Sequence, residues 1–411
     1  MNSDTTLASL PGAATAAAPS LHAVPAAART ALALLRRLQV GTLHLEGPGG
    51  FSQVCGRGEA PHATLRLHDW RTCAWTLQRG DVGFGEAYLE GGWSTPDLPA
   101  LLRLLIANRE VLEQAVYGTW WGALWRRVRH ALHRNTRAGS RRNIAAHYDL
   151  GNAFYRLWLD DTLNYSSAWF DGRTDQSLPA AQRAKMRRAL AECGLQPGQR
   201  VLEVGCGWGA VAEQAARDGL QLTGVTLSTE QLAHAQARLA AQGLRADLRL
   251  QDYRDIPERD FDGIVSIEMF EAVGREYWAG YFRSLHERLK PGGRACIQTI
   301  TIRDDLFERY LRGTDFIQQY VFPGGLLPSP SAFRAAAEAA GFQVVNELHF
   351  GGDYAETLRR WRRSFLAREG SVREQGFDER FVRLWDFYLA YCEAAFDTGN
   401  TGVVQFTLQR A

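Results

Sequence analysis

A glycine-rich turn in the middle of the chain is the first feature whose residue types and spacing indicate chemistry. The apolar stretch Val201–Val204, interrupted only by Glu203, leads into alternating glycines. The turn consists of Gly205, Cys206, Gly207, Trp208 and Gly209. Because glycine has no side chain, a bulky ligand can lie against this backbone at the amino end of the following helix. Nicotinamide and flavin domains use a similar turn, so the glycines alone do not identify the ligand.

The segment after the turn distinguishes between ligands. A dinucleotide site places an acidic residue about 20 residues beyond the first glycines, where it holds the ribose hydroxyls. This chain has Thr226, Leu227 and Ser228 in that region, which argues against a nicotinamide cofactor. Glu203 can neutralise an ammonium group, such as the amino-acid end of S-adenosylmethionine. The alternative for Glu203 is a partly solvated acid at the end of a strand.

Alternating strands and helices must position these groups. Strands are expected at 201–204, 220–225, 248–250, 263–266 and 295–300, with an alanine-rich helix between the first two. This order predicts an α/β fold with an open, doubly wound, Rossmann-like parallel sheet that continues to about Leu348. Asp252 and Tyr253 follow the third strand, where an adenine can receive a carboxylate and an aromatic edge. A surface loop is the alternative for this pair.

A smaller N-terminal domain of mixed α and β character is expected over residues 29–118. Alternating apolar runs at 42–45, 64–67 and 74–77, separated by glycine and proline, predict a small antiparallel sheet. A helix is expected from Ala100 to Val116. Residues 1–28 are rich in Ala, Ser, Thr and Pro without helical periodicity, which predicts a disordered leader.

The bulk composition excludes several classes of protein. A net charge of +2 on 411 residues gives no drive toward nucleic acid, and none is expected as a partner. The six cysteines form no Cys-X-X-Cys pair and no close Cys/His group, so neither a disulfide framework nor a metal site is expected. No apolar stretch reaches the roughly 18 residues that a transmembrane helix needs. We therefore expect a cytoplasmic protein.

Two basic segments that contain tryptophan indicate contact with a membrane surface. Residues 119–142, the expected linker between the domains, contain seven arginines and three tryptophans but no acidic residue. Arginine pairs with phosphate and tryptophan favours the membrane interface, so this segment suits a lipid headgroup surface. Leu358–Arg363 repeats the pattern. The alternative for each is a helix with a solvated basic face.

Several motifs, in order along the chain, resemble those of the cyclopropane-fatty-acyl-phospholipid synthases and their mycolic-acid-modifying relatives. They are His147–Asn152, Leu163–Ala168, the Gly205–Gly209 turn, Gly224–Ser228 with Glu230 and Gln231, Met269–Glu271, Phe322–Gly325 and Asp353–Tyr354. The resemblance runs from about Arg57 to the C-terminus. Gly83–Tyr88 with Trp93 resembles the accessory domain of the phospholipid-acting branch.

The resemblance implies a class I methyltransferase domain at 143–411, preceded by the α+β accessory domain, which would be similar to a lipid-binding module. It implies S-adenosylmethionine as the cofactor. Together with Glu203 and Gly205, Cys206, Gly207 and Gly209 of the turn, the contacts would come from Tyr165, Ser166, Thr226, Leu227, Gln231, Asp252 and Tyr253.

The resemblance also implies a bicarbonate ion that acts as a base beside the cofactor. In this sequence the five positions that would hold it are Ser167, Glu271, Gln298, the backbone of Ile300, and Tyr354. The family has a cysteine at the position of Ser167 and a histidine at that of Gln298, and Ala272 stands where a histidine is usual. Serine and glutamine still hydrogen-bond to anions, so bicarbonate stays an expectation.

The implied activity is transfer of a methyl or methylene group to the cis double bond of an unsaturated acyl chain of phospholipid, at the inner membrane face. Proton loss from the new methyl closes a cyclopropane ring, whereas loss from a neighbouring carbon gives a methylated or methylene-bearing chain, and later reduction a methyl branch. The altered base positions leave both outcomes open. The competing hypotheses are a small-molecule methyltransferase and a lipid-binding protein with a disabled catalytic domain. A homodimer is a further expectation.

Overall fold

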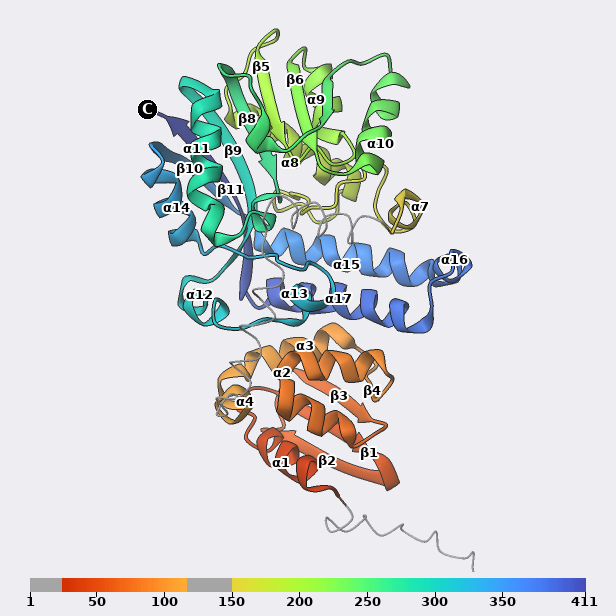
Figure 1. The fold of residues 1–411 in the computed structure, drawn as a ribbon. Coiled ribbons are helices and arrows are strands. Elements are labelled where there is room, and N and C mark those ends of the chain that lie inside the picture. The colour runs from red at the N-terminus through yellow and green to blue at the C-terminus, as the bar shows by residue number, and fades with distance from the viewer. Residues whose placement is uncertain (1–23, 117–149) are drawn as a thin grey trace, which may run out of the picture.

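The computed structural model describes residues 24–116 and 150–411, which form two domains (Figure 1). The leader at 1–23, the basic segment at 119–142 and the first residues of the His147–Asn152 motif lie outside the described residues. In Figure 1 the N-terminal domain, in red and orange, lies against the long helix α17 (Glu379–Asp397), and the helix α15 (Gly351–Ala367) packs on the other side of α17. These two helices separate it from the larger sheet of the second domain.

The second domain is built on a seven-stranded sheet in the order β10-β11-β9-β8-β5-β6-β7. The strands are β5 (Arg200–Val204), β6 (Gln221–Thr226), β7 (Asp247–Leu250), β8 (Phe261–Ile267), β9 (Leu289–Ile302), β10 (Phe342–His349) and β11 (Thr401–Arg410). The ladders from β7 to β9 are parallel, and β11 runs antiparallel to both its neighbours. The predicted doubly wound α/β fold is therefore confirmed. The prediction that the sheet ends near Leu348 was wrong, because the C-terminal β11 inserts between β9 and β10.

The order of the strands places a crevice at the carboxyl ends of β5 and β8. Successive strands are added on one side of β5 as β6 and β7, and on its other side as β8 and β9. The loops after β5 and β8 run to opposite sides of the sheet, so a gap opens between them. Open α/β sheets bind ligands in such a gap.

Helices cover both faces of this sheet (Figure 1). The helices that pack on its strands are α8 (Leu178–Glu192), α9 (Ala210–Arg217), α10 (Thr229–Ala240), α11 (Trp278–Arg288) and α14 (Pro330–Ala339). With α15 and α17, the helices α7 (Asn152–Tyr155), α12 (Asp304–Tyr310), α13 (Phe316–Tyr320) and α16 (Glu369–Glu374) lie toward the end of the sheet that faces the N-terminal domain. Short 3-10 turns are η3 (Tyr253–Asp255), η4 (Phe270–Ala272) and η5 (Arg275–Tyr277). Side chains of Ser177, Ser228, Ser329 and Asp378 accept backbone hydrogen bonds at the starts of α8, α10, α14 and α17. These caps explain where the helices begin.

The N-terminal domain packs helices on a four-stranded sheet in the order β2-β1-β3-β4. Its elements are α1 (Ala26–Leu35), β1 (Thr42–Gly47), η2 (Pro48–Gly50), β2 (Phe51–Gly56), β3 (His62–Leu67), α2 (Arg71–Leu89), β4 (Trp93–Ser94), α3 (Leu98–Ala107) and α4 (Arg109–Val116). The sheet is mixed rather than antiparallel, because β1 and β3 pair in parallel.

Three further local predictions in this domain were wrong. The run 74–77 belongs to α2 and not to a strand, and α1 begins at Ala26, inside the expected leader. The helix predicted over 100–116 is broken at Asn108, whose side-chain oxygen accepts hydrogen bonds from the backbone N–H groups of Gln39 and Val40 at 2.7 and 3.0 Å. The break lets this side chain satisfy a turn that precedes β1.

The two domains share part of their apolar core. Phe316 of α13 and Phe387 of α17 are buried in the same cluster as Trp93 and Leu101 of the N-terminal domain. Polar contacts reinforce the interface: the Tyr88 hydroxyl donates to Asp386 at 2.8 Å, and Arg103 pairs with Asp397 at 2.7 Å. The N-terminal domain is thus fixed to the helical layer below the large sheet.

Candidate active site

The glycine turn lies at the crevice and adopts a backbone that requires glycine. Gly205, Gly207 and Gly209 have φ values of 89°, 47° and 83°. These lie in the left-handed region that side chains disfavour. A Cβ on Gly209 would lie 2.7 Å from the Cβ of Ala235, so this glycine also lets α9 approach α10. No atom lies within 4 Å of the corresponding point at Gly207, which leaves its backbone open to a ligand among the residues that the structure describes.

Glu203 carries an unsatisfied buried carboxylate directly before this turn. Its side chain is 3% exposed, and its Oε2 has no hydrogen-bond partner within the described part of the chain. Burial raises the pKa of this carboxyl to about 8. A buried carboxylate without a partner is costly unless a cation approaches it. Glu203 therefore fits the ammonium group of S-adenosylmethionine, and the glycine turn fits the short chain that joins this ammonium group to the sulfur.

The predicted residues after β6 form a closed hydrogen-bond network. Thr226 donates its hydroxyl to the Gln231 side chain at 2.9 Å and accepts from the backbone of Ser228 at 3.2 Å. Ser228 in turn caps α10 by accepting from the Gln231 N–H. Leu227, between them, is half-buried. These contacts fix the turn that follows β6. This turn lies beside the glycine turn that follows β5, because β5 and β6 are paired in the sheet.

Asp252 and Tyr253 follow β7, as expected. The Asp252 carboxylate is 3% exposed and pairs with the Arg254 guanidinium at 2.6 Å. Tyr253 packs edge-on against Tyr281 with ring centroids 5.5 Å apart. Cys206, in the turn, is buried, and burial raises the pKa of its thiol well above the usual range, so it is not a thiolate nucleophile.

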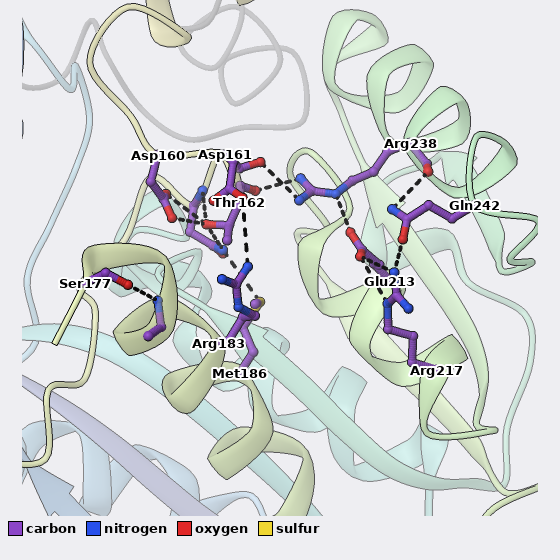
Figure 2. Close-up of polar contacts among 12 residues, drawn as sticks. Asp160, Asp161, Thr162, Ser177, Arg183, Met186, Glu213, Arg217, Arg238 and Gln242 are labelled. Atoms are coloured by element: carbon purple, nitrogen blue, oxygen red, sulfur yellow. Dashed lines mark hydrogen bonds and ion pairs between the residues drawn. The ribbon is translucent and has the colours of Figure 1, made fainter.

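The chain just before Tyr165, at Asp161 and Thr162, is held against α9 and α10 by Arg238 (Figure 2). The Arg238 guanidinium donates to the backbone oxygens of Thr162 and Asp161 at 2.7 and 3.2 Å, and it pairs with Glu213 at 2.7 Å. The Ser167 N–H, further along this segment, donates to Glu268 at the end of β8 at 2.8 Å.

We expect Arg238→Met to lower the free energy of unfolding by about 1–3 kcal/mol, because several charge-assisted hydrogen bonds are lost. Chemical denaturation with a fixed m-value checks this. Arg183→Met is the matched control: Arg183 lies 4.0 Å from Asp161 and is about half exposed, so its loss should change stability by less than about 0.5 kcal/mol. Equal effects of the two variants would contradict the role of Arg238.

Tyr165 and Ser166 lie at the edge of a buried aromatic cluster. The Tyr165 hydroxyl shares a hydrogen bond of 2.8 Å with that of Tyr388, and its ring contacts Trp158 and Trp361. The Ser166 hydroxyl accepts a 2.6 Å hydrogen bond from the fully buried Lys185. Sequence reasoning missed Lys185. Its spacing could have indicated burial: Lys185 lies four residues from both Ala181 and Ala189, so all three share the buried face of α8.

Three of the five positions expected to hold an anion meet around a residue that sequence reasoning did not select. The carboxylate of Glu268 accepts hydrogen bonds from the Ser167 N–H at 2.8 Å, the Gln298 amide at 2.7 Å and the Tyr354 hydroxyl at 2.8 Å. Ser167 contributes its backbone, because its hydroxyl donates to the oxygen of Ala168. The signal was an acid directly after β8, within the same segment as Met269–Glu271.

Glu271 lies beside Glu268 and binds the backbone of Ile300. Its Oε1 accepts from the Ile300 N–H at 2.5 Å, whereas its Oε2 is buried without a hydrogen-bond partner among residues 24–116 and 150–411. Burial, and then the charge of Glu268, raise the pKa of Glu271 to about 8. At neutral pH the pair therefore holds a protonated Glu271 next to Glu268.

The basic helix segment Leu358–Arg363 buries its tryptophan and pairs three of its arginines with acids, whereas Arg363 is exposed. Trp361 is fully buried. Arg359 and Arg360 pair with Glu356 at 2.5 and 2.7 Å, and Arg362 pairs with Asp386 at 2.6 Å. These charges are already neutralised by neighbouring acids. All six cysteines lie in described segments and are free, and no helix of those segments is long and apolar enough to cross a membrane.

The fold and the site define an S-adenosylmethionine-dependent methyltransferase: a sheet with one antiparallel strand next to its edge, a glycine turn at the switch point and a buried acid that fits an ammonium. A family model described as mycolic acid cyclopropane synthetase matches residues 135–406. The chain belongs to this family of enzymes, which act on fatty acyl chains.

Relatives of known name agree with this assignment. The chain is 38% identical over 399 residues to the tuberculostearic acid methyltransferase UfaA1 of Mycobacterium tuberculosis, covering 94% of this chain and 93% of the relative. It is 34% identical over 356 residues to the cyclopropane-fatty-acyl-phospholipid synthase of Escherichia coli, covering 86% and 89%. The crystal structure of mycolic acid cyclopropane synthase CmaA1 with SAH and CTAB is similar, with a TM-score of 0.62 at 35% identity, over 66% of this chain and 98% of that one.

Proposed function

We propose that this enzyme transfers a one-carbon unit from S-adenosylmethionine to the cis double bond of an unsaturated acyl chain in membrane phospholipid and closes a cyclopropane ring. The observation that carries the proposal is a cluster of buried carboxyl groups and aromatic rings beside a cofactor turn. Similarity over most of both chains to an acyl-phospholipid synthase supports the phospholipid substrate. The cofactor supplies an activated methyl group on a positively charged sulfur.

The chain's own residues then have three tasks. Glu203 would pair with the ammonium, and the backbone of Gly205–Gly209 would accept the chain that joins it to the sulfur. An isolated alkene is a weak nucleophile, so the protein must hold it in line with the methyl group. The rings of Tyr165, Trp158 and Trp361, which pack at centroid distances of 5.4–5.6 Å, would shelter the resulting carbocation from water and stabilise its charge.

A second product has support of its own. The chain resembles a tuberculostearic acid methyltransferase over nearly its full length, and Ser167 and Gln298 differ from the residues that the synthase resemblance implies. Proton loss from a chain carbon would then give a methylene-bearing or methylated alkene instead of a ring. The two products share the methyl transfer and differ only in which proton leaves.

Incubation with labelled S-adenosylmethionine and vesicles of unsaturated phospholipid tests these proposals. Label in the acyl chains is expected, and NMR of the product distinguishes a cyclopropane ring from a methylene group. Label that enters only soluble amines would exclude the lipid substrate. Membrane association at the cytoplasmic face is also a proposal; flotation with anionic vesicles should retain the protein, and neutral vesicles should retain less. Sedimentation equilibrium tests the proposed homodimer.

A further inference from the structure

Glu268 has a backbone conformation that the surrounding structure must impose. Its φ is 49°, in the left-handed region that a glutamate rarely occupies, and the cost is about 1–3 kcal/mol. The Glu268 N–H donates to the Gln298 oxygen at 2.8 Å, which fixes the residue at the end of β8. Strain of this kind persists where the surrounding contacts require it, and it gathers at active sites.

The Glu268 carboxylate lies beside the cofactor turn. The next residue, Met269, contacts the turn directly: a Cβ on Gly205 would lie 3.0 Å from the Met269 Cγ. β8 and β5 are adjacent in the sheet, so the acid that follows β8 stands at the same edge as Glu203. Three donors hold the two carboxylate oxygens in a fixed orientation at this edge.

The charges around Glu268 favour its ionised form over that of Glu271. Burial raises the pKa of Glu268, and the cation of Lys185, which is fully buried in α8, opposes this rise together with the donors from Ser167, Gln298 and Tyr354. Among the described residues Glu271 has no comparable cation, and the charge of Glu268 adds to the rise of its pKa that burial causes. Of the two carboxyl groups, Glu268 therefore gives up its proton more readily than Glu271.

We propose that the carboxylate of Glu268 is the base of this enzyme and that it occupies the place that a bound bicarbonate ion would need. The inference rests on the proposed function. Ser167, Gln298 and Tyr354, three of the five positions expected to hold that ion, already donate to Glu268. A separate anion there would compete for the same donors and would place a second negative charge against the carboxylate.

The step balances without another reactant. The alkene π pair forms the bond to the transferred methyl carbon as the bond to sulfur breaks, and the positive charge moves to the neighbouring chain carbon. A Glu268 oxygen then takes one proton. If the proton comes from the new methyl, the C–H pair forms the third bond of a cyclopropane; if it comes from a chain carbon, the pair forms a double bond. Glu268 then releases its proton to water.

Two substitutions of Glu268 separate the base from the space that it fills. Glu268→Gln keeps the shape without the charge, and we expect at least about a 100-fold loss of kcat, as general-base loss typically gives. Glu268→Gly suits the left-handed backbone and removes the carboxylate. Added formate or bicarbonate should restore part of its activity, and carbon NMR should show labelled bicarbonate bound to Glu268→Gly but not to the wild type. Glu347→Gln, at the distant strand β10, is the control and should keep full activity.

The opposite results would overturn the proposal. Wild-type activity that disappears in bicarbonate-free buffer and returns on its addition would show that an external ion is the base, as would full activity of Glu268→Gln. Calorimetry should give cofactor affinities within about threefold of the wild type for both variants, so loss of binding would point to misfolding. If the wild type modifies no acyl chain, the proposed function fails, and the bicarbonate NMR still tests whether Glu268 fills the anion position.

Lys185→Met tests the charge arrangement through pH. Without the cation, the pKa of Glu268 rises, so the pH below which activity falls should move upward by about one unit or more. A purely structural role would lower activity equally at every pH. Lys290→Met, which removes a surface lysine paired with Asp262, should leave the pH profile unchanged. An unshifted profile in active Lys185→Met would contradict the assigned role.

Discussion

Glu203→Gln is expected to weaken S-adenosylmethionine binding by at least about 100-fold while it stabilises the protein without cofactor. The affinity falls because the amide cannot neutralise the ammonium, and loss of a buried charge pair costs about 2–5 kcal/mol. The stability rises because the native carboxylate is buried and its Oε2 has no hydrogen-bond partner in the described residues. Calorimetric titration measures the first effect, and denaturation without cofactor measures the second.

The pH dependence of stability gives this prediction a sign. The carboxyl of Glu203 has a pKa of about 8 in the folded protein and 4.5 as its ordinary value. Between these values the unfolded chain has released its proton and the folded chain has kept it. The free energy of unfolding therefore falls as pH rises, by about 1.4 kcal/mol per unit from this group, and Glu203→Gln should remove that slope. Glu46→Gln, an exposed control, should change neither quantity; unchanged affinity in Glu203→Gln would contradict the ammonium assignment.

The local geometry of the proposed cofactor turn could be predicted because it depends on local chemistry. Three positive φ values within five residues require the glycines of the turn, and the acid before them lies on a strand whose apolar pattern is unambiguous. The hydroxyls of Thr226 and Ser228 act within the same turn. Features of this kind lie within short segments, so they can be recognised from the sequence alone.

The base could not be predicted because it is assembled from distant segments. Glu268 is held by Ser167, Gln298 and Tyr354, which come from a loop, β9 and α15. Its orientation depends on a left-handed backbone conformation, which the residue type glutamate does not predict. Lys185 likewise looks like a surface lysine of a helix until the sheet covers it. A resemblance that assigns the surrounding positions to an ion therefore overlooks a carboxylate that the chain itself provides.

The fold errors have a similar cause. The run 74–77 has an alternating apolar pattern, but four residues are too few to separate a strand from a half-buried turn of α2. β11 was missed because residues 403–408 are all buried, so a strand covered on both faces loses its alternation. In both cases the neighbouring elements decide the structure, and a short window cannot contain them.

Trp361→Ala is expected to have the second large effect, because Trp361 joins the shelter of the reacting carbon to the residues that hold the base. Its ring is fully buried and contacts Trp158, Tyr165 and Tyr354, at centroid distances of 5.6, 5.6 and 6.1 Å. Truncation of a buried tryptophan costs about 3–5 kcal/mol. Tyr354, which donates to Glu268, would lose the ring that packs against it.

The product should change together with the stability. A cavity beside the carbocation admits water, and attack by water followed by proton loss gives a hydroxylated, methyl-bearing chain, detectable by mass spectrometry 18 mass units above the normal product (about one water). Trp361→Phe is the matched variant. The Trp361 indole N–H has no partner in the part of the chain that the structure describes, so phenylalanine loses no hydrogen bond and should keep most of the activity without the hydroxylated product. If Trp361→Ala proved as stable as Trp361→Phe and gave no hydroxylated chain, the ring would shelter nothing, and the water-free character of this site would have to come from other residues.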